Sequence, residues 1–159
     1  MHSMKPILKF IVAVTIPLAV GAVAGFFTSS SVKGWFTTLH KPSFNPPSWL
    51  FAPVWTILYI LMGVALFLIW KNNTEPQLKK TAITLFFVQL AFNFLWSFIF
   101  FYAQQPGWAL VDIILLWLMI LFTILSFGKI STAAAWLLLP YICWVSFATI
   151  LNYSIWKLN

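Results

Sequence analysis

Acidic side chains are scarce in this chain of 159 residues, which contains Glu75, Asp112 and no arginine. Histidine is equally scarce, being present only as His2 and His40. A nucleophile–base–acid triad would have to use His40 as its base. Neither a HExxH zinc motif nor a glycine-rich phosphate loop is present. These absences argue against hydrolytic and metal-dependent active sites, and we expect no cofactor and no resident metal.

Cysteine occurs only as Cys143, which excludes an internal disulfide and a cysteine metal cluster. The lysines give a formal net charge of +7. They form no basic tract and fall between apolar runs, where lysine meets lipid headgroups. The charge therefore does not indicate a nucleic acid partner. Charged residues that would line a conduction path are also missing, so an ion channel has little support.

Apolar residues dominate what is present, since 62% of the chain is hydrophobic and 7% is charged. Long apolar runs recur, each near the ~20 residues that a helix needs to cross a bilayer. Backbone groups in lipid have to be satisfied within the segment, so each run is predicted to be a helix. We expect one all-α domain over residues 1–159, an integral membrane bundle of five transmembrane helices. The predicted spans are about 6–28, 48–70, 78–102, 107–127 and 132–156, with a loop at 29–52.

The lysines predict the orientation of this bundle. Three lie on the side of the 29–52 loop, namely Lys33, Lys41 and Lys157. The other six lie on the side of the N-terminus. Cytoplasmic loops carry an excess of lysine and arginine, so the N-terminus is predicted to be cytoplasmic and the loop to be outside.

The segment Trp35–Trp55 is the most informative part of the chain. It concentrates four prolines, three tryptophans and three phenylalanines between the first two apolar runs. Proline fixes φ and removes a backbone donor, so we expect no helix until Pro53 is passed. A stiff aromatic segment beside membrane helices suggests a lid over a flat, apolar ligand.

Three polar residues lie inside predicted spans. Asp112 sits about one turn into the fourth span, either as a helix-packing acid or as a ligand contact. Gln89 and Asn93 lie four residues apart in the third span, with Trp96 on the same face. These amides either bond across helices or line a pocket.

Ten tryptophans exceed what interfacial belts require. Ala148 would leave a gap one turn from Trp144, suitable for an aromatic ring. Lys33, His40 and Lys41 would meet either ligand carboxylates or lipid phosphates. The tryptophans beside polar or proline-rich features are the pocket candidates: Trp35, Trp49, Trp55, Trp96, Trp108 and Trp144.

The order of these motifs resembles the tryptophan-rich sensory protein / translocator protein (TspO) family, which includes the mitochondrial peripheral benzodiazepine receptor. The resemblance covers nearly the whole chain, and it indicates a bacterial member. Its most specific parts are Trp35-Phe36…Lys41-Pro42-Ser43-Phe44-Asn45-Pro46-Pro47-Ser48-Trp49…Pro53-Val54-Trp55, Gln89-Leu90…Asn93…Trp96, Gly107-Trp108-Ala109-Leu110-Val111-Asp112 and Pro140-Tyr141…Trp144…Phe147-Ala148…Leu151-Asn152. Phe44 and His40 depart from residues common in animal members.

The resemblance implies a multi-pass protein of the bacterial cell membrane, often a homodimer. It also implies partners: protoporphyrin IX or a related tetrapyrrole, isoquinoline carboxamide or benzodiazepine ligands, and membrane lipid. The implied ligand-binding residues are Trp35, Phe51, Trp55, Asn93, Trp96, Trp108, Trp144, Ala148 and Leu151.

Three functions remain open at this stage. The first is a porphyrin-binding protein that senses, sequesters or promotes light- and oxygen-dependent degradation of protoporphyrin IX. In that case the resemblance implies Trp55 and Trp144 as the residues that take part in the chemistry. The alternative is a transporter of tetrapyrroles or other lipophilic molecules. A third interpretation is a receptor whose ligand changes its association state.

Overall fold

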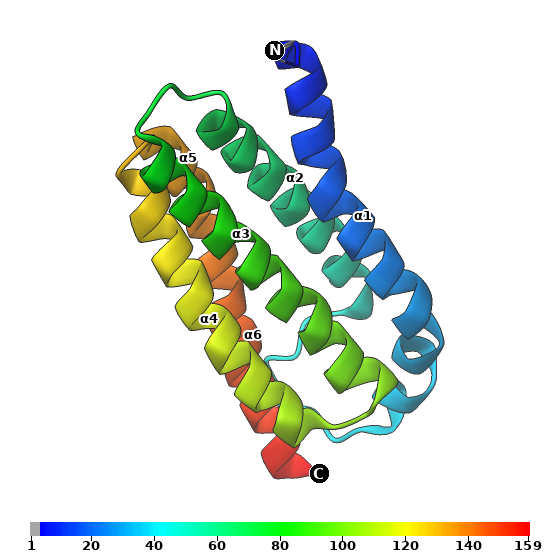
Figure 1. Cartoon of the computed structure of the whole chain (residues 1–159). Coiled ribbons are helices and arrows are strands. Elements are labelled where there is room, and N and C mark those ends of the chain that lie inside the picture. Colours follow the sequence, from blue (N-terminus) through cyan, green and yellow to red (C-terminus); the bar gives the residue numbers. More distant parts are fainter. Residues whose placement is uncertain (1–3) are drawn as a thin grey trace.

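The computed structural model describes residues 4–159, so His2 and the rest of residues 1–3 lie outside it. The described residues form helices and contain no strand (Figure 1). The predicted all-α class is confirmed. Five segments are long and apolar enough to cross a membrane: Pro6–Thr38, Ser48–Trp70, Pro76–Tyr102, Pro106–Gly128 and Thr132–Leu158.

The first two spans flank the proline-rich loop. Helix α1 is followed by a short 3₁₀ turn, η1, and a second 3₁₀ turn, η2, leads into α2. The third span joins α3 to a π-helical segment, η3, and the fifth joins α5 to α6. The bounds are α1 Pro6–Lys33, η1 Trp35–Thr38, η2 Ser48–Leu50, α2 Phe51–Trp70, α3 Pro76–Ser97, η3 Phe98–Tyr102, α4 Pro106–Gly128, α5 Thr132–Leu137 and α6 Leu139–Leu158.

The end of α1 differs from the prediction, which placed a break at Ser29-Ser30-Ser31. The helix continues to Lys33. Two of its polar side chains bond to carbonyls of the preceding turn: Thr28 Oγ1 donates to the Ala24 carbonyl at 2.8 Å, and Ser29 Oγ donates to the Phe26 carbonyl at 3.4 Å. Hydroxyls satisfied in this way can remain inside a helix.

The start of α2 also differs from the prediction, because the helix begins at Phe51, before Pro53. The expectation that no helix forms until Pro53 is passed is wrong. The first N–H groups of a helix have no acceptor within it, so a proline in the first turn removes no intrahelical hydrogen bond.

The fifth span is interrupted at Leu138, between α5 and α6, where a continuous helix was expected. Pro140 follows two residues later, at the start of α6. Its ring lacks the N–H that would bond to a carbonyl of the preceding turn, and this accounts for the restart of the helix.

The helices form one bundle in which α1 packs along α2, α3 along α4, and α4 along α6. Helix α5 contacts both α2 and α4, and η3 returns to α1. The two ends of the chain lie at opposite ends of the bundle (Figure 1). Near the N-terminal end, the Lys9 ammonium lies 5.7 Å from the Trp70 ring and Lys79 Nζ donates to the Trp70 carbonyl at 3.0 Å. Which end faces the cytoplasm remains a prediction.

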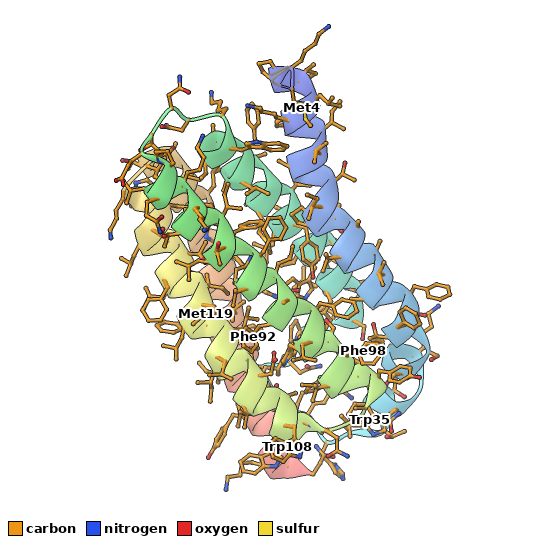
Figure 2. All side chains as sticks on the ribbon, viewed as in Figure 1. Met4, Trp35, Phe92, Phe98, Trp108 and Met119 are labelled. Atoms are coloured by element: carbon orange, nitrogen blue, oxygen red, sulfur yellow. The ribbon has the colours of Figure 1, made fainter. Side chains whose placement is uncertain are left out.

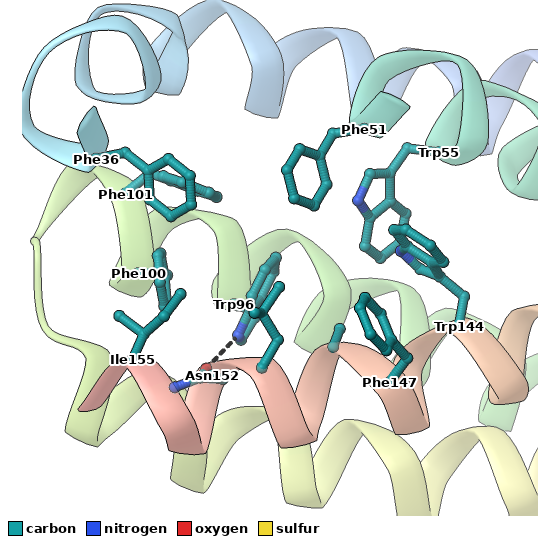
Figure 3. Close-up of a pocket in the computed structure, with 12 residues that line it drawn as sticks. Phe36, Phe51, Trp55, Trp96, Phe100, Phe101, Trp144, Phe147, Asn152 and Ile155 are labelled. Carbon is teal, nitrogen blue, oxygen red and sulfur yellow. Dashed lines mark hydrogen bonds between the residues drawn. The ribbon is translucent and has the colours of Figure 1, made fainter. Parts of the chain in front are cut away.

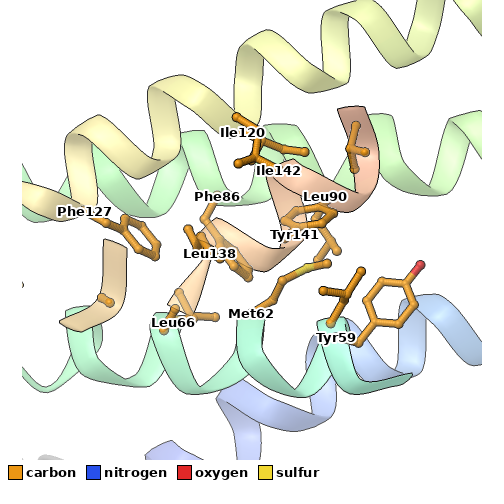
Figure 4. Close-up of a cluster of buried hydrophobic side chains, with 14 of the residues drawn as sticks. Tyr59, Met62, Leu66, Phe86, Leu90, Ile120, Phe127, Leu138, Tyr141 and Ile142 are labelled. Carbon is orange, nitrogen blue, oxygen red and sulfur yellow. The ribbon is translucent and has the colours of Figure 1, made fainter. Parts of the chain in front are cut away.

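Close packing inside the bundle depends on small residues and interlocking apolar side chains. A Cβ on Gly63 would meet the backbone of Val14 and lie 2.8 Å from the Ala13 carbonyl oxygen, so α1 and α2 touch here. Many large apolar side chains point outward, as expected of a surface in lipid (Figure 2). The main buried cluster includes Met62, Leu66, Phe86, Leu90, Ile120, Phe127, Leu138 and Tyr141 (Figure 4).

Candidate functional site

Two adjoining cavities lie at the end of the bundle that carries the proline-rich loop. The larger has a volume of about 610 Å³ and is lined by α1, α2 and the end of the third span. The smaller has a volume of about 30 Å³ and lies toward α6. Their common wall consists of aromatic side chains from four segments of the chain. These are Phe36, Phe51, Trp55, Trp96 and Phe101.

The smaller cavity is almost filled by the protein's own rings (Figure 3). The Trp96 and Phe100 centroids are 5.4 Å apart, and those of Phe51 and Trp144 are 6.3 Å apart. Since a water molecule needs roughly 10–15 Å³ of such space, this cavity has room for about two or three waters. A flat organic ligand would enter it only if these rings moved.

The larger cavity exists because α1 presents small residues to α2. A Cβ built on Gly25 meets no atom within 4 Å, so the open space begins at the helix backbone. Gly21 has a different role: it allows α1 to lie against the Tyr59 ring, which a Cβ at this position would overlap. The volume falls within the range of about 300–1,000 Å³ that small-molecule sites occupy. This cavity can accommodate a flat ligand without rearrangement of the smaller one.

Nearly parallel aromatic rings form one wall of the larger cavity. The Trp55 ring stacks on Tyr59 with centroids 5.7 Å apart and planes inclined by 30°. The Trp96 ring lies 6.3 Å from Trp55 at an inclination of 32°. Trp96 is fixed by its Nε1–H, which donates to Asn152 Oδ1 at 2.9 Å, while Asn152 Nδ2 donates to the Pro106 carbonyl at 2.8 Å (Figure 3). The wall thus consists of aromatic rings that are held in place by one another and by these hydrogen bonds.

Behind Tyr59, a chain of buried hydrogen bonds links three helices. The Tyr59 hydroxyl donates to Asn93 Oδ1 at 2.7 Å, and Asn93 Nδ2 donates to the Tyr141 hydroxyl at 2.8 Å. The Tyr141 hydroxyl donates to Gln89 Oε1 at 2.7 Å. Both amides therefore bond across helices, which is the first of the two interpretations of the sequence. Asn93 positions the wall through Tyr59 and lines neither cavity.

The proline-rich loop is fastened to the last helix by Asn159. Its Oδ1 accepts from the His40 backbone N–H at 3.0 Å, and its Nδ2 donates to the His40 carbonyl at 2.8 Å. The same Nδ2 also donates to Ile155 at 2.7 Å. The loop segment that follows Phe36 is therefore held to α6 beside the smaller cavity.

Comparison with known proteins identifies the family of this chain. Residues 13–157 match the TspO/MBR family. The tryptophan-rich protein TspO of Chlorobaculum tepidum is 46% identical over 155 residues, which cover 98% of each chain. This chain belongs to the TspO/MBR family. It is also 39% identical over 145 residues to the translocator protein of Sus scrofa, covering 88% of this chain and 86% of that one.

A third relative of this TspO/MBR chain is the tryptophan-rich sensory protein of Cereibacter sphaeroides, 34% identical over 152 residues that cover 96% of this chain and 90% of the relative. The resemblance noted from the loop and the spans is confirmed. Together with the five apolar helices, family membership confirms a multi-pass membrane protein. It also supports a membrane function connected with tetrapyrroles.

Six of the nine residues that the family resemblance implied as ligand contacts lie at the cavities. Phe51, Trp55 and Trp96 line both. The remaining three, which line only the smaller cavity, are Trp144, Ala148 and Leu151.

Trp35, Asn93 and Trp108 line neither of the two cavities. Trp35 packs against Phe100, with ring centroids 5.9 Å apart. Trp108 lies on the outer surface with 69% of its area exposed (Figure 2). Asp112 is buried, and neither of its carboxylate oxygens has a hydrogen-bond partner among residues 4–159. Asp112 also lines neither of the two cavities.

Apart from Lys33, no residue of α1 was predicted to contribute to the site. The contribution of α1 includes Gly21, Gly25 and Thr28, which line the larger cavity. A signal was present in the run Gly21-Ala22-Val23-Ala24-Gly25, because small residues are typical of close contacts between membrane helices. The structure has such a contact at Gly21, where a Cβ would meet the Tyr59 ring, whereas a Cβ on Gly25 meets no atom within 4 Å. The aromatic lining residues that were also not predicted are Phe36, Tyr59, Phe100, Phe101 and Phe147.

Proposed function

We propose that this protein binds protoporphyrin IX or a related tetrapyrrole in the larger cavity, with the ring system against Trp55, Tyr59 and Trp96. The observation that carries the proposal is the 610 Å³ cavity with one wall of nearly parallel aromatic rings. Offset stacking on such rings stabilises flat π systems and buries a large apolar area. Flat isoquinoline carboxamide or benzodiazepine ligands would occupy the same wall.

Bound in this way, the tetrapyrrole is sequestered or sensed, and under light it is degraded. An indole in contact with an excited porphyrin can donate an electron without a general acid or base. The reduced porphyrin passes this electron to dioxygen, which becomes superoxide, and the indole radical cation recovers an electron from the porphyrin ring. Superoxide then adds to the porphyrin radical cation, so that the net reaction is the addition of dioxygen to the porphyrin. Trp55 lies at the wall of the larger cavity, whereas Trp144 lines only the smaller one. Trp55 is therefore the first electron donor. Trp144 is the second donor and lies behind Phe51, with the centroids of the Phe51 and Trp144 rings 6.3 Å apart.

The test is a titration of purified protein with protoporphyrin IX in the dark, followed by tryptophan quenching and then by illumination in air. Saturable binding with protein-dependent bleaching supports the whole proposal. Saturable binding without bleaching refutes degradation and leaves sequestration or transport as the function. Measuring porphyrin flux into sealed liposomes distinguishes these two. Absence of saturable binding refutes the proposal.

Variants of the two tryptophans separate binding from chemistry. Trp55→Phe should weaken both binding and bleaching, because Trp55 forms the wall. Trp144→Phe should leave binding in the larger cavity nearly unchanged and reduce bleaching. Equal loss of binding and bleaching in Trp144→Phe would count against a redox role for that indole.

The proposed assembly is a homodimer in the membrane, as the family resemblance implies. If the ligand acts through association, its addition will change the dimer fraction measured in detergent by sedimentation or light scattering. An unchanged fraction would reject the interpretation of the protein as a receptor that acts by changing its association state.

A further inference from the structure

The larger cavity carries one cation at its edge. Among the described residues that line either cavity, Lys33 is the single charged side chain. It is the last residue of α1 and is exposed, so its ammonium can reach both the cavity and the surrounding medium. Its position is fixed by the continuation of α1 beyond the three serines.

Among residues 4–159, neither acidic side chain lies opposite this lysine. Glu75 precedes α3 and lies at the other end of the bundle from the loop (Figure 1). Asp112 is buried in α4 and lines neither cavity. The aliphatic hydroxyls that share the larger cavity with Lys33 are uncharged, namely Thr28, Ser29, Ser48, Thr56 and Ser97. The cavity therefore combines an aromatic wall with one cation that faces neither acidic side chain of residues 4–159.

The other two lysines at this end of the bundle have different surroundings. The Lys41 ammonium lies 4.8 Å from the centroid of the Phe36 ring, and its Nζ donates to the Leu39 carbonyl at 3.3 Å. The Lys157 ammonium lies 5.4 Å from the Trp156 ring and 6.0 Å from the Tyr153 ring. Neither lines a cavity. Lys33 alone among the three is placed to meet a bound ligand.

We propose that Lys33 makes the larger cavity select ligands that carry a carboxylate at one end of a flat apolar body. The proposal rests on the proposed function, because it names the chemical class within the ligands of that site. If the Lys33 ammonium contacted only lipid phosphates, it would add nothing to the binding of a ligand carboxylate. The cavity would then show no such selection.

The test compares protoporphyrin IX, which has two carboxylates, with its dimethyl ester, which has the same ring and none. Both are titrated in a neutral detergent against the wild type, Lys33→Met and the matched control Lys157→Met. The wild type should bind the acid roughly threefold to tenfold more tightly than the ester, as expected of a partly solvated charged hydrogen bond. This ratio should fall to about one in Lys33→Met and persist in Lys157→Met.

Binding of the ester serves as the internal measure of folding, and it should be equal in all three proteins. Lys33→Glu should weaken binding of the acid further and leave the ester unaffected. An acid-to-ester ratio that is the same in Lys33→Met as in the wild type overturns the role of Lys33 while leaving the proposed function intact. Saturable binding of neither porphyrin to the wild type overturns both.

Discussion

The indole of Trp55 stacks on the ring of Tyr59, with centroids 5.7 Å apart and planes inclined by 30°. Trp55 faces both cavities, whereas the Tyr59 hydroxyl points away into the hydrogen-bonded chain that begins at Asn93. The stacking surface for a ligand and the polar core of the bundle therefore meet in this pair. A change in the core is expected to reach the cavity wall through Tyr59.

Tyr59→Phe tests how much this chain of buried hydrogen bonds stabilises the fold. The substitution removes the donor to Asn93 Oδ1 and leaves a buried acceptor unpaired. Hydrogen bonds across membrane helices contribute about 0.6–2 kcal/mol in model systems, and we expect a loss of stability of that size. Thermal unfolding in detergent measures it. Tyr153→Phe is the control, because Tyr153 is exposed and donates no hydrogen bond in the structure. Equal stability of Tyr59→Phe and the wild type would contradict the account.

Gly63→Ala should be among the most damaging small substitutions in the bundle. The added Cβ would meet the backbone of Val14 and the Ala13 carbonyl, neither of which can rotate aside, so α1 and α2 would have to separate. Overpacking of this kind costs about 1–3 kcal/mol. Gly25→Ala is the matched control: its Cβ meets open space, and alanine favours helix by up to about 1 kcal/mol over glycine. Unfolding that is equally early in both variants would refute the close contact at Gly63.

Ala148→Thr should alter the smaller cavity. Ala148 is buried beside Trp144 in a space of about 30 Å³, so the added atoms have little room. We expect overpacking to lower the free energy of unfolding by about 1–3 kcal/mol, while ligands in the larger cavity bind with nearly unchanged affinity. Thermal unfolding in detergent measures the stability, and calorimetric titration with an isoquinoline carboxamide measures the affinity. A loss of affinity as large as that of Trp55→Phe would place the ligand in the smaller cavity and contradict the account.

Asn159→Ala should loosen the proline-rich loop. Two hydrogen bonds between Asn159 and the His40 backbone would be lost, each contributing about 0.5–1.5 kcal/mol. We expect faster porphyrin association and dissociation in stopped-flow experiments, with a smaller change in affinity. Ser154→Ala, which removes an exposed hydroxyl bonded within α6, is the control. Rates that match the wild type would show that the loop does not limit access.

Much of the fold follows from the sequence, because lipid leaves helix as the available structure for each apolar run. The errors lie at helix ends. Serines that bond within their own helix do not stop it, and Pro53 is tolerated because a first turn needs no donor there. Both effects depend on backbone geometry that hydropathy does not reveal.

The site was less predictable than the fold. The sequence indicates a position at the pocket for Trp55, Trp96 and Trp144, because each has polar residues or prolines as neighbours. Trp108 has similar neighbours in the sequence but is exposed, since the rotation of α4 about its axis decides which face it occupies. Gly25 shows the opposite case: a small residue predicts contact, and the structure shows open space instead.

The most direct measurement of the central claim is the dark titration of Gly25→Leu with protoporphyrin IX beside the wild type and Val23→Leu. Gly25 lines the larger cavity and a Cβ there meets no atom within 4 Å, so a leucine side chain would take up space in this cavity, whereas Val23 is exposed and lines neither cavity. The account predicts at least roughly tenfold weaker binding in Gly25→Leu, the effect of about 1.4 kcal/mol, and wild-type affinity in Val23→Leu. Wild-type affinity in Gly25→Leu would contradict the account, because the ligand would then bind elsewhere.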